Sequence, residues 1–391
     1  MSNASFNALI MLVLGSALGA ASFALWSSAT SPSVEFAAGT TTTTLAPATA
    51  TTLAATTTTT VGPTTTTTPH PTTTAPPPTT TIPPKEMLVI HGVGDVTPDP
   101  NYIPALVSNG YDHAWSGLGG IFQRDDLTVV NLECVPSDIG APLEKDFVFR
   151  CPTEALPSIR DAGVEVASLG NNHSGDYGKE ALIDGRAQLI AAGIHPVGAG
   201  SDYEEAGAPA VFEIGGWTVA VVGFGGVAPS PSWYAGENRP GMRSGDDTEG
   251  MVEAVAAAAE IADLVVVTVH WGFELDTTPR PDDIERARAM VAAGADIIFG
   301  HHQHRLGPFG FEDGAAVFWG LGNFVWPHNS TESATTGIGR VVVQPDGSME
   351  MCLIPAFIVS HGHPVITGDP ECGPRLGPEL PPVGDPDAVA I

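Results

Sequence analysis

The chain has 391 residues, with 44 acidic and 15 basic side chains, and its formal net charge is −29 at pH 7. This charge argues against nucleic acid as a partner, and it offers no basic surface to anionic lipid headgroups. A divalent cation would instead offset part of the negative field locally.

The first 84 residues are not typical of a globular domain. No charged residue precedes Glu35, and residues 8–26 are almost continuously apolar. As a helix this run is about 28 Å long, close to the hydrocarbon thickness of a bilayer. Residues 1–30 are therefore predicted to be a signal peptide or an uncleaved membrane anchor. Residues 31–84 are rich in Thr, Pro and Ala, which predicts a disordered stalk, O-glycosylated or plain.

Both N-terminal segments predict an exported protein, either anchored at the extracytoplasmic face of the membrane or secreted. Residues 85–360 are long enough for one large core, and residues 361–391 are predicted to be a C-terminal tail. The four cysteines form two local pairs, Cys134 with Cys151 and Cys352 with Cys372. In an exported chain two disulfides are expected, and a thiolate metal site is the alternative.

Apolar, β-branched runs alternate with segments of helical periodicity in residues 85–360. This alternation predicts an α/β domain with a largely parallel buried sheet and antiparallel additions near its end. A Pro-, Gly- and Ser-rich loop at residues 225–250 is expected to lie over the site. The predicted strands are 87–93, 127–130, 164–169, 195–197, 210–214, 217–223, 264–269, 295–299 and 316–319, with a hairpin at 339–343 and 348–354; the predicted helices are 114–122, 152–162, 179–192, 251–261 and 281–293.

Polar clusters follow five of the predicted strands. In α/β proteins such clusters meet beyond the carboxyl ends of the strands. Two of the histidines are spaced i, i+2, and an extended chain would send both rings to one side. The clusters are Asp95; Glu133; Asn172 with His173; His270; and His302 with His304.

Carboxylate, amide and imidazole groups together predict a site for divalent metal, with two ions expected, of zinc, manganese or iron. Two ions about 3.5–4 Å apart would clamp a phosphate ester and activate water. Glu133 would bridge the two ions, Asp95 and His304 would bind the first, and Asn172, His270 and His302 would bind the second. His173 would be the general acid, with Asp176 orienting it. Taken singly, each residue also fits a turn, a cap or a buried histidine.

Six short motifs, in this order, resemble those of the CapA family of capsule or poly-gamma-glutamate biosynthesis proteins. The resemblance covers residues 87–326 and implies a metallophosphatase-like sheet sandwich flanked by helices, of the calcineurin-like superfamily. The motifs are Gly94-Asp95-Val96, Asn131-Leu132-Glu133, Asn171-Asn172-His173 with Asp176 and Gly178, His270-Trp271-Gly272, Gly300-His301-His302-Gln303-His304 and Gly320-Leu321-Gly322-Asn323-Phe324.

The resemblance implies a role in the assembly or export of an anionic polymer, with membrane-bound capsule synthesis subunits as partners. We assign substrate binding to Asn131, Asn171, His301 and Asn323. The chain departs from the phosphoesterase pattern at Thr97, Glu133 and Gln303, which stand where that pattern or the family has His, Asp and Pro. Three functions remain open: a phosphoesterase, a non-catalytic polyanion-binding assembly or export factor, and an amide hydrolase acting on the polymer.

Overall fold

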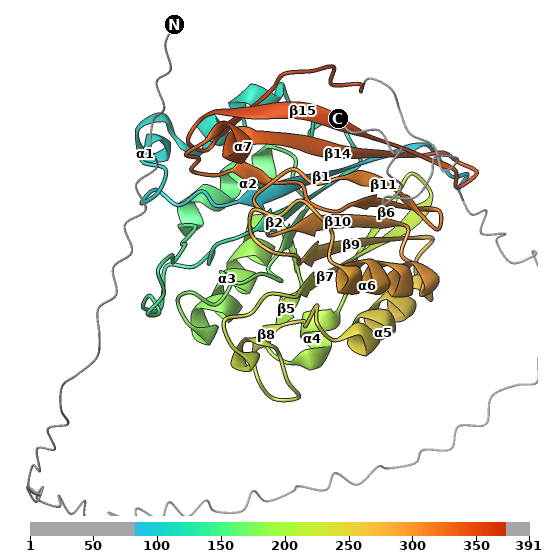
Figure 1. Ribbon diagram of the computed structural model, residues 1–391, viewed down its shortest axis with the longest axis horizontal. Coiled ribbons are helices and arrows are strands. Elements are labelled where there is room, and N and C mark those ends of the chain that lie inside the picture. Colours follow the sequence, from blue (N-terminus) through green and yellow to red (C-terminus); the bar gives the residue numbers. More distant parts are fainter. Residues whose placement is uncertain (1–82, 373–391) are drawn as a thin grey trace, which may run out of the picture. The chain divides into compact units, whose positions relative to one another are not determined.

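Two β-sheets face each other in the protein, and helices cover the outer face of each (Figure 1). The structure, a computed structural model, describes residues 83–372. The predicted signal or anchor helix, the stalk and the end of the predicted tail lie outside these residues. No helix within residues 83–372 is long and apolar enough to cross a bilayer.

The first sheet has eight strands and is mixed. The strands β1 to β4, which form one half of this sheet, run parallel to one another. They are buried on both faces, as is typical of strands with continuous apolar sequences. The antiparallel half is the C-terminal hairpin with its extensions. In spatial order the strands are β16 (His363–Ile366), β15 (Met349–Ser360), β14 (Thr335–Val343), β1 (Leu88–Val96), β2 (Leu127–Leu132), β3 (Val166–Ser168) and β4 (His195–Val197), and β13 (Asn323–Val325) also pairs with β1.

The second sheet has six strands, with a parallel centre and an antiparallel strand at each edge. Its four parallel strands are again buried and rich in Val, Ile and Phe. The strands in order are β11 (Phe309–Glu312), β12 (Ala315–Phe318), β10 (Ile297–His301), β9 (Leu264–His270), β7 (Trp217–Gly225) and β6 (Ala210–Ile214); a separate pair is β5 (Ala199–Gly200) with β8 (Gly241–Met242).

The two sheets pack closely because a glycine lies opposite a large ring. A Cβ at Gly92 of β1 would lie 2.4 Å from the ring of Phe299 in β10. Fully buried side chains from both sheets, such as Ile90, Val129 and Val266, fill the space around this contact. The close approach brings the carboxyl ends of β1 and β2 near those of β9 and β10.

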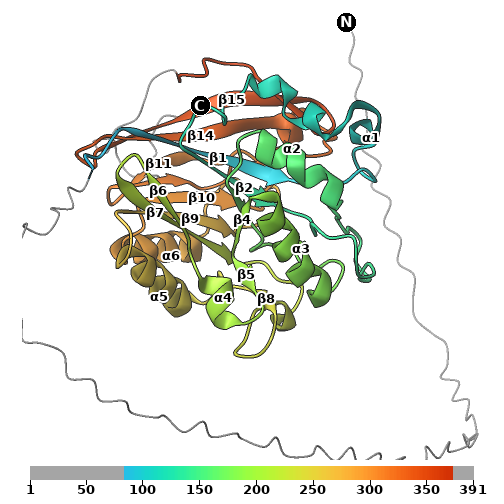
Figure 2. The same ribbon diagram turned by 180° about the vertical axis from the view of Figure 1, so that it is seen from behind.

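Helices seal the outer face of each sheet. Leu156 and Leu182 belong to the core outside the first sheet, and Met251 and Met290 to the core outside the second. Figure 2 shows α2 and α3 in front of β1, β2 and β4. The longer helices are α2 (Leu156–Asp161), α3 (Lys179–Ala192), α5 (Thr248–Ala259) and α6 (Pro281–Ala292); short ones are α1 (Ala105–Asn109), η1 (Tyr111–Ala114), η2 (Ser116–Leu118), η3 (Thr153–Ala155), α4 (Tyr203–Gly207), η4 (Pro231–Trp233) and α7 (Thr331–Ala334).

The mixed α/β class and most predicted elements are confirmed, and α3, β4 and β6 have the predicted bounds. The two sheets agree with the sandwich that the family resemblance implies. Two expectations are wrong. The predicted helix at 114–122 is the pair of short turns η1 and η2, because Gly119 and Gly120 adopt positive φ. The fold also continues past residue 360, where β16 pairs with β15.

Both predicted disulfides are present, Cys134–Cys151 and Cys352–Cys372. The first closes the loop between β2 and η3, and both of its cysteines are fully buried. Chain entropy assigns about 3 kcal/mol to a crosslink of this length. We expect the double variant Cys134→Ala/Cys151→Ala to lose about this much free energy of unfolding, measured by urea denaturation.

The matched control is Cys352→Ala/Cys372→Ala, whose sequence separation is 20 against 17. It should lose a similar free energy, but limited proteolysis at residues 136–149 should increase only in the first variant. Equal cleavage of that loop in both variants would contradict the assignment of the first disulfide as its clamp.

Candidate metal centre

The first sheet contributes acids and amides from the ends of its parallel strands. Asp95 on β1 pairs in register with Asn131 on β2, and Glu133 is the first residue after the end of β2. A Cβ at Gly94 would lie 2.0 Å from the carbonyl oxygen of Gly322. Only glycine therefore lets the Gly320-Leu321-Gly322 segment come against β1, which brings Asn323 beside Asp95.

The second sheet contributes imidazoles. His270 ends β9 and pairs in register with His301, which ends β10. His302 and His304 lie beyond the strand and both have positive φ, 96° and 52°. The expectation of an extended i, i+2 pair is therefore wrong. Instead, a turn sends the two rings into two different groups of donors, and left-handed backbone at non-glycine residues is typical of functional sites.

Two donor groups meet at one carboxylate. Ligand atoms of Glu133, His270 and His302 lie within 4.8 Å of one another, as do those of Asp95, Glu133 and His304. Glu133 is common to both groups. Both of its carboxylate oxygens are buried and have no hydrogen-bond partner. An unpaired buried carboxylate is costly, and a cation between these donors would remove that cost, so the residues present fit a divalent metal.

The charges of these groups follow from their burial. Burial, followed by the charge of Asp95, raises the pKa of Glu133 well above its usual value. Burial would also raise the pKa of Asp95, but the hydrogen bond and charge of His304 outweigh it and lower that pKa. Burial lowers the pKa of His302 to about 4 and that of His270 well below its usual value. The imidazoles of His270 and His302 are thus neutral at pH 7, the form that binds metals.

The four residues predicted to bind substrate lie behind the donors. Asn131 Nδ2 donates to Asp95 Oδ1 at 2.8 Å, and Asn171 Nδ2 donates to Asn131 Oδ1 at 3.1 Å. Asn323 Oδ1 lies 2.9 Å from His304 Nδ1. All three amides and His301 are buried, and the Nε2 atom of His301 lies 3.1 Å from Thr268 Oγ1. This arrangement supports a positioning role for these residues instead of direct substrate contact.

His173 faces the donors from the side of the first sheet. Its Nδ1 lies 2.7 Å from Asp176 Oδ2, and its Nε2 lies 3.9 Å from Glu133 Oε1. Lys145 completes the group by donating to Asp176 Oδ1 at 2.6 Å and to the carbonyl oxygen of Asn172 at 2.8 Å. The sequence reading missed Lys145, because a single lysine in an acidic loop carries no motif.

The neighbouring donor Asn172 contacts the second sheet. Its Oδ1 lies 2.9 Å from His270 Nε2, which joins the end of β3 to the end of β9. The structure thus gathers all the predicted site residues at one place. Gln303, where the family has Pro, donates from Nε2 to the carbonyl oxygen of Trp319 and so supports the histidine loop.

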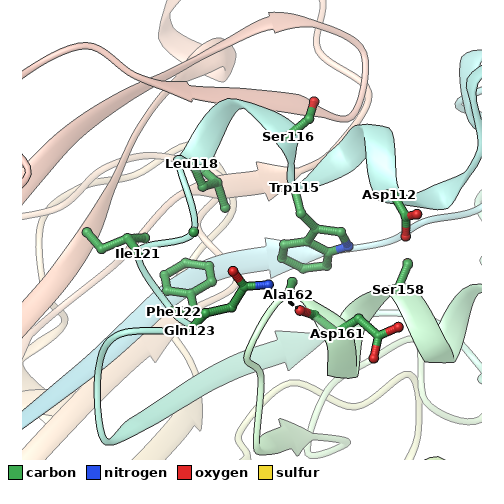
Figure 3. A pocket seen from close by; sticks show the side chains of 11 residues that line it. Asp112, Trp115, Ser116, Leu118, Ile121, Phe122, Gln123, Ser158, Asp161 and Ala162 are labelled. Carbon is green, nitrogen blue, oxygen red and sulfur yellow. Dashed lines mark hydrogen bonds between the residues drawn. The ribbon is translucent and has the colours of Figure 1, made fainter.

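Cavities in the described part of the chain include one that reaches the donors and one that does not. One, of about 650 Å³, opens at Asn172 and His302 and runs between residues 226–246 and 272–280. The predicted 225–250 loop therefore does border the site. The other, of about 390 Å³, lies between η2 and α2 (Figure 3). It is lined by Trp115, Phe122 and Asp161, and none of the metal donors reaches it.

The protein has two facing mixed sheets, and a buried cluster of carboxylates and histidines lies at the ends of their strands. These features define an α/β protein with a candidate metal centre. Residues 89–328 match the family described as "Bacterial capsule synthesis protein PGA_cap". The chain belongs to this family, which confirms the resemblance found in its motifs.

Individual relatives agree with this membership. The chain is 31% identical over 285 residues to the "Capsule biosynthesis protein CapA" of Bacillus anthracis, over 70% of this chain and 68% of that protein. It is 29% identical over 259 residues to the "PGA biosynthesis protein CapA" of Bacillus subtilis (strain 168), over 66% and 68%. Among solved structures it is similar to the NAD nucleotidase of Haemophilus influenzae, with a TM-score of 0.41 and 14% identity over 73% of this chain and 54% of that one.

Proposed function

We propose that the protein is a metal-dependent hydrolase of the phosphoesterase type, acting in capsule or poly-gamma-glutamate biosynthesis. The observation that carries this proposal is Glu133, a buried and unpartnered carboxylate shared by two histidine-containing donor groups. Phosphoester hydrolysis is the chemistry that such paired donor groups serve, and family membership supplies the polymer pathway.

In this proposal Asp95, Glu133 and His304 hold one cation, and His270, His302 and Asn172 complete a second position with Glu133. Bound cations would polarise the phosphoryl group and lower the pKa of a water molecule. The chain's own residues then move the proton. His173 Nδ1–H is held by Asp176, so Nε2 is the atom that faces the donors; the imidazolium form of His173 would deliver its Nε2 proton to the leaving oxygen and return to the neutral ring.

The test is manganese-dependent hydrolysis of bis-p-nitrophenyl phosphate by the full-length chain. Replacing His173 by Gln should lower kcat by about 100-fold or more for an alkyl phosphodiester, whose leaving alkoxide needs a proton, and far less for bis-p-nitrophenyl phosphate, because the substitution removes the proton donor but none of the proposed ligands. Metal content, measured by mass spectrometry, should stay unchanged. His270→Ala should lower both metal content and rate.

The alternative is a non-catalytic factor that uses the same pocket to hold a polyanion. Poly-gamma-glutamate pulled down by the metal-loaded chain, with no turnover of any ester, would favour it. Because the protein is itself strongly acidic, such binding should be lost on chelation.

We also propose that the protein is exported and tethered to the membrane. The apolar run at residues 8–26 and the two disulfides support export. Protease added to intact cells should therefore remove the domain, while a cytoplasmic control protein stays intact. Protection of the domain until cells are lysed would refute export.

A further inference from the structure

We propose that the cavity beside the metal centre takes a long apolar chain, so that the substrate is an amphiphilic phosphoester, the ester of a long-chain alcohol. This inference rests on the proposed function and names the substrate class of the same site. The cavity holds about 650 Å³ and reaches the donors at Asn172 and His302. A group attached to a phosphoryl centre at the donors would therefore extend into it.

The walls of the cavity are mainly apolar or small. One wall is the segment Val227-Ala228-Pro229 with Pro231 and Tyr234, and the other carries Phe273. Phe273 is 60% exposed although it is a large aromatic side chain. The guanidinium carbon of Arg280 lies 5.0 Å from its ring centroid, which holds the ring at the edge of the cavity.

A second feature of the same loop is the conformation of Leu275. Its φ is 65°, in the left-handed region that a leucine rarely adopts, and its side chain is 62% exposed. The backbone is held there by the hydrogen bond from Leu275 N to the carbonyl oxygen of Gln303, at 2.8 Å. Folding alone gains nothing from presenting an apolar side chain to water on strained backbone, whereas binding an apolar ligand does.

Away from the metal donors, the charges of the cavity do not favour a polyanionic occupant. Its charged lining residues, within the described part of the chain, are Asp246, Glu274 and Arg280. Arg280 is already paired with Asp283 through two hydrogen bonds of 2.6 and 2.7 Å. The remaining charge is acidic and would repel a polymer of carboxylates or phosphates, but it does not oppose an uncharged alkyl chain.

Five exposed apolar side chains lie on two loops that contact the site. Ile139, Leu143 and Phe147 are on the loop held by the Cys134–Cys151 disulfide, and Phe273 and Leu275 are on the loop after β9. Only Phe273 of these lines the cavity, so the two loops can be separated by experiment. An amphiphile that merely adsorbs to the rim would use Phe147, which is 61% exposed, as much as Phe273.

The experiment compares decyl phosphate with methyl phosphate, both below the micellar concentration. Their binding to the full-length, manganese-loaded and metal-free chain is measured by calorimetry. We expect decyl phosphate to bind at least about tenfold more tightly, because several methylene groups leave water. Phe273→Ser should reduce this ratio to about threefold or less. Phe147→Ser should keep it, as should Val107→Ser on α1, the matched control with 72% exposure.

Equal affinities for the two phosphates would overturn the inference, and so would an equal loss of the ratio in Phe147→Ser and Phe273→Ser. Turnover of decyl and methyl p-nitrophenyl phosphate is measured in parallel. A chain-length preference in binding without turnover would support the cavity's role and refute the hydrolase. Equal binding with equal turnover of both esters would support the hydrolase and refute the apolar subsite.

Discussion

Replacing Glu133 by Gln is expected to abolish metal loading and to lower phosphodiester hydrolysis by about 100-fold or more. The reason is that Glu133 belongs to both donor groups, so one substitution removes a ligand from each. A loss of rate of about 100-fold corresponds to the loss of several kcal/mol of charge stabilisation at the reacting centre. Metal content by mass spectrometry and the rate with bis-p-nitrophenyl phosphate are the measurements.

The same variant separates a metal role from a structural one. In the metal-free protein Glu133 is a buried carboxylate without a partner, so its neutral analogue should leave the melting temperature unchanged or raise it. In the wild-type protein saturating manganese should add about 2.7 kcal/mol at 100 times the Kd, and Glu133→Gln should lose this gain. The exposed Glu260→Gln is the control and should keep it. A metal-free Glu133→Gln that melts well below wild type would mean that Glu133 holds the fold instead of a cation.

Metal affinity is expected to rise about tenfold per pH unit in the range below the raised pKa of Glu133. Burial and the charge of Asp95 keep a proton on Glu133, and a cation must displace it. The lowered pKa of Asp95 leaves that carboxylate ionised, and burial keeps His270 and His302 neutral by lowering the pKa of His270 well below its usual value and that of His302 to about 4. Binding therefore releases about one proton, and affinity falls as pH falls.

Calorimetry in two buffers of different ionisation enthalpy counts the released protons. The control is Glu165→Gln. Burial also raises the pKa of Glu165, to about 7, but this residue bonds Thr128 N at the opposite end of β2 from the site. Its variant should keep the same slope. No proton release at any pH above the usual pKa range of a glutamate, or a slope that disappears in Glu165→Gln, would show that Glu133 is not the titrating ligand.

Local sequence was enough to predict much of this protein. The helix Lys179–Ala192 and most strands of both sheets follow from apolar periodicity, because each pattern is set by residues close along the chain, whereas β11, β13 and β16 were not predicted. The site residues could be named for a related reason: each polar cluster directly follows a buried strand, and strand ends are where α/β proteins place their sites. Spacing along the chain likewise indicated both disulfide pairs.

Other features depended on contacts between distant segments. The close approach of the two sheets at Gly92 and Phe299 joins residues more than two hundred positions apart that share no local pattern. Lys145 reaches Asp176 from a loop held by a disulfide. The left-handed backbone of His302 and His304 likewise departs from the extended chain that their local spacing predicted.

The sequence by itself therefore determined the α/β class, the family and the chemical types of the donors. The sandwich and the sharing of Glu133 were also expected, whereas only the tertiary structure decided that His302 and His304 leave strand geometry, that Lys145 joins Asp176, and that an acidic, apolar-walled cavity lies beside the donors. The physical reason is that strand and helix patterns reflect local burial, whereas a contact between loops and a cavity are defined by distances between segments remote in the chain.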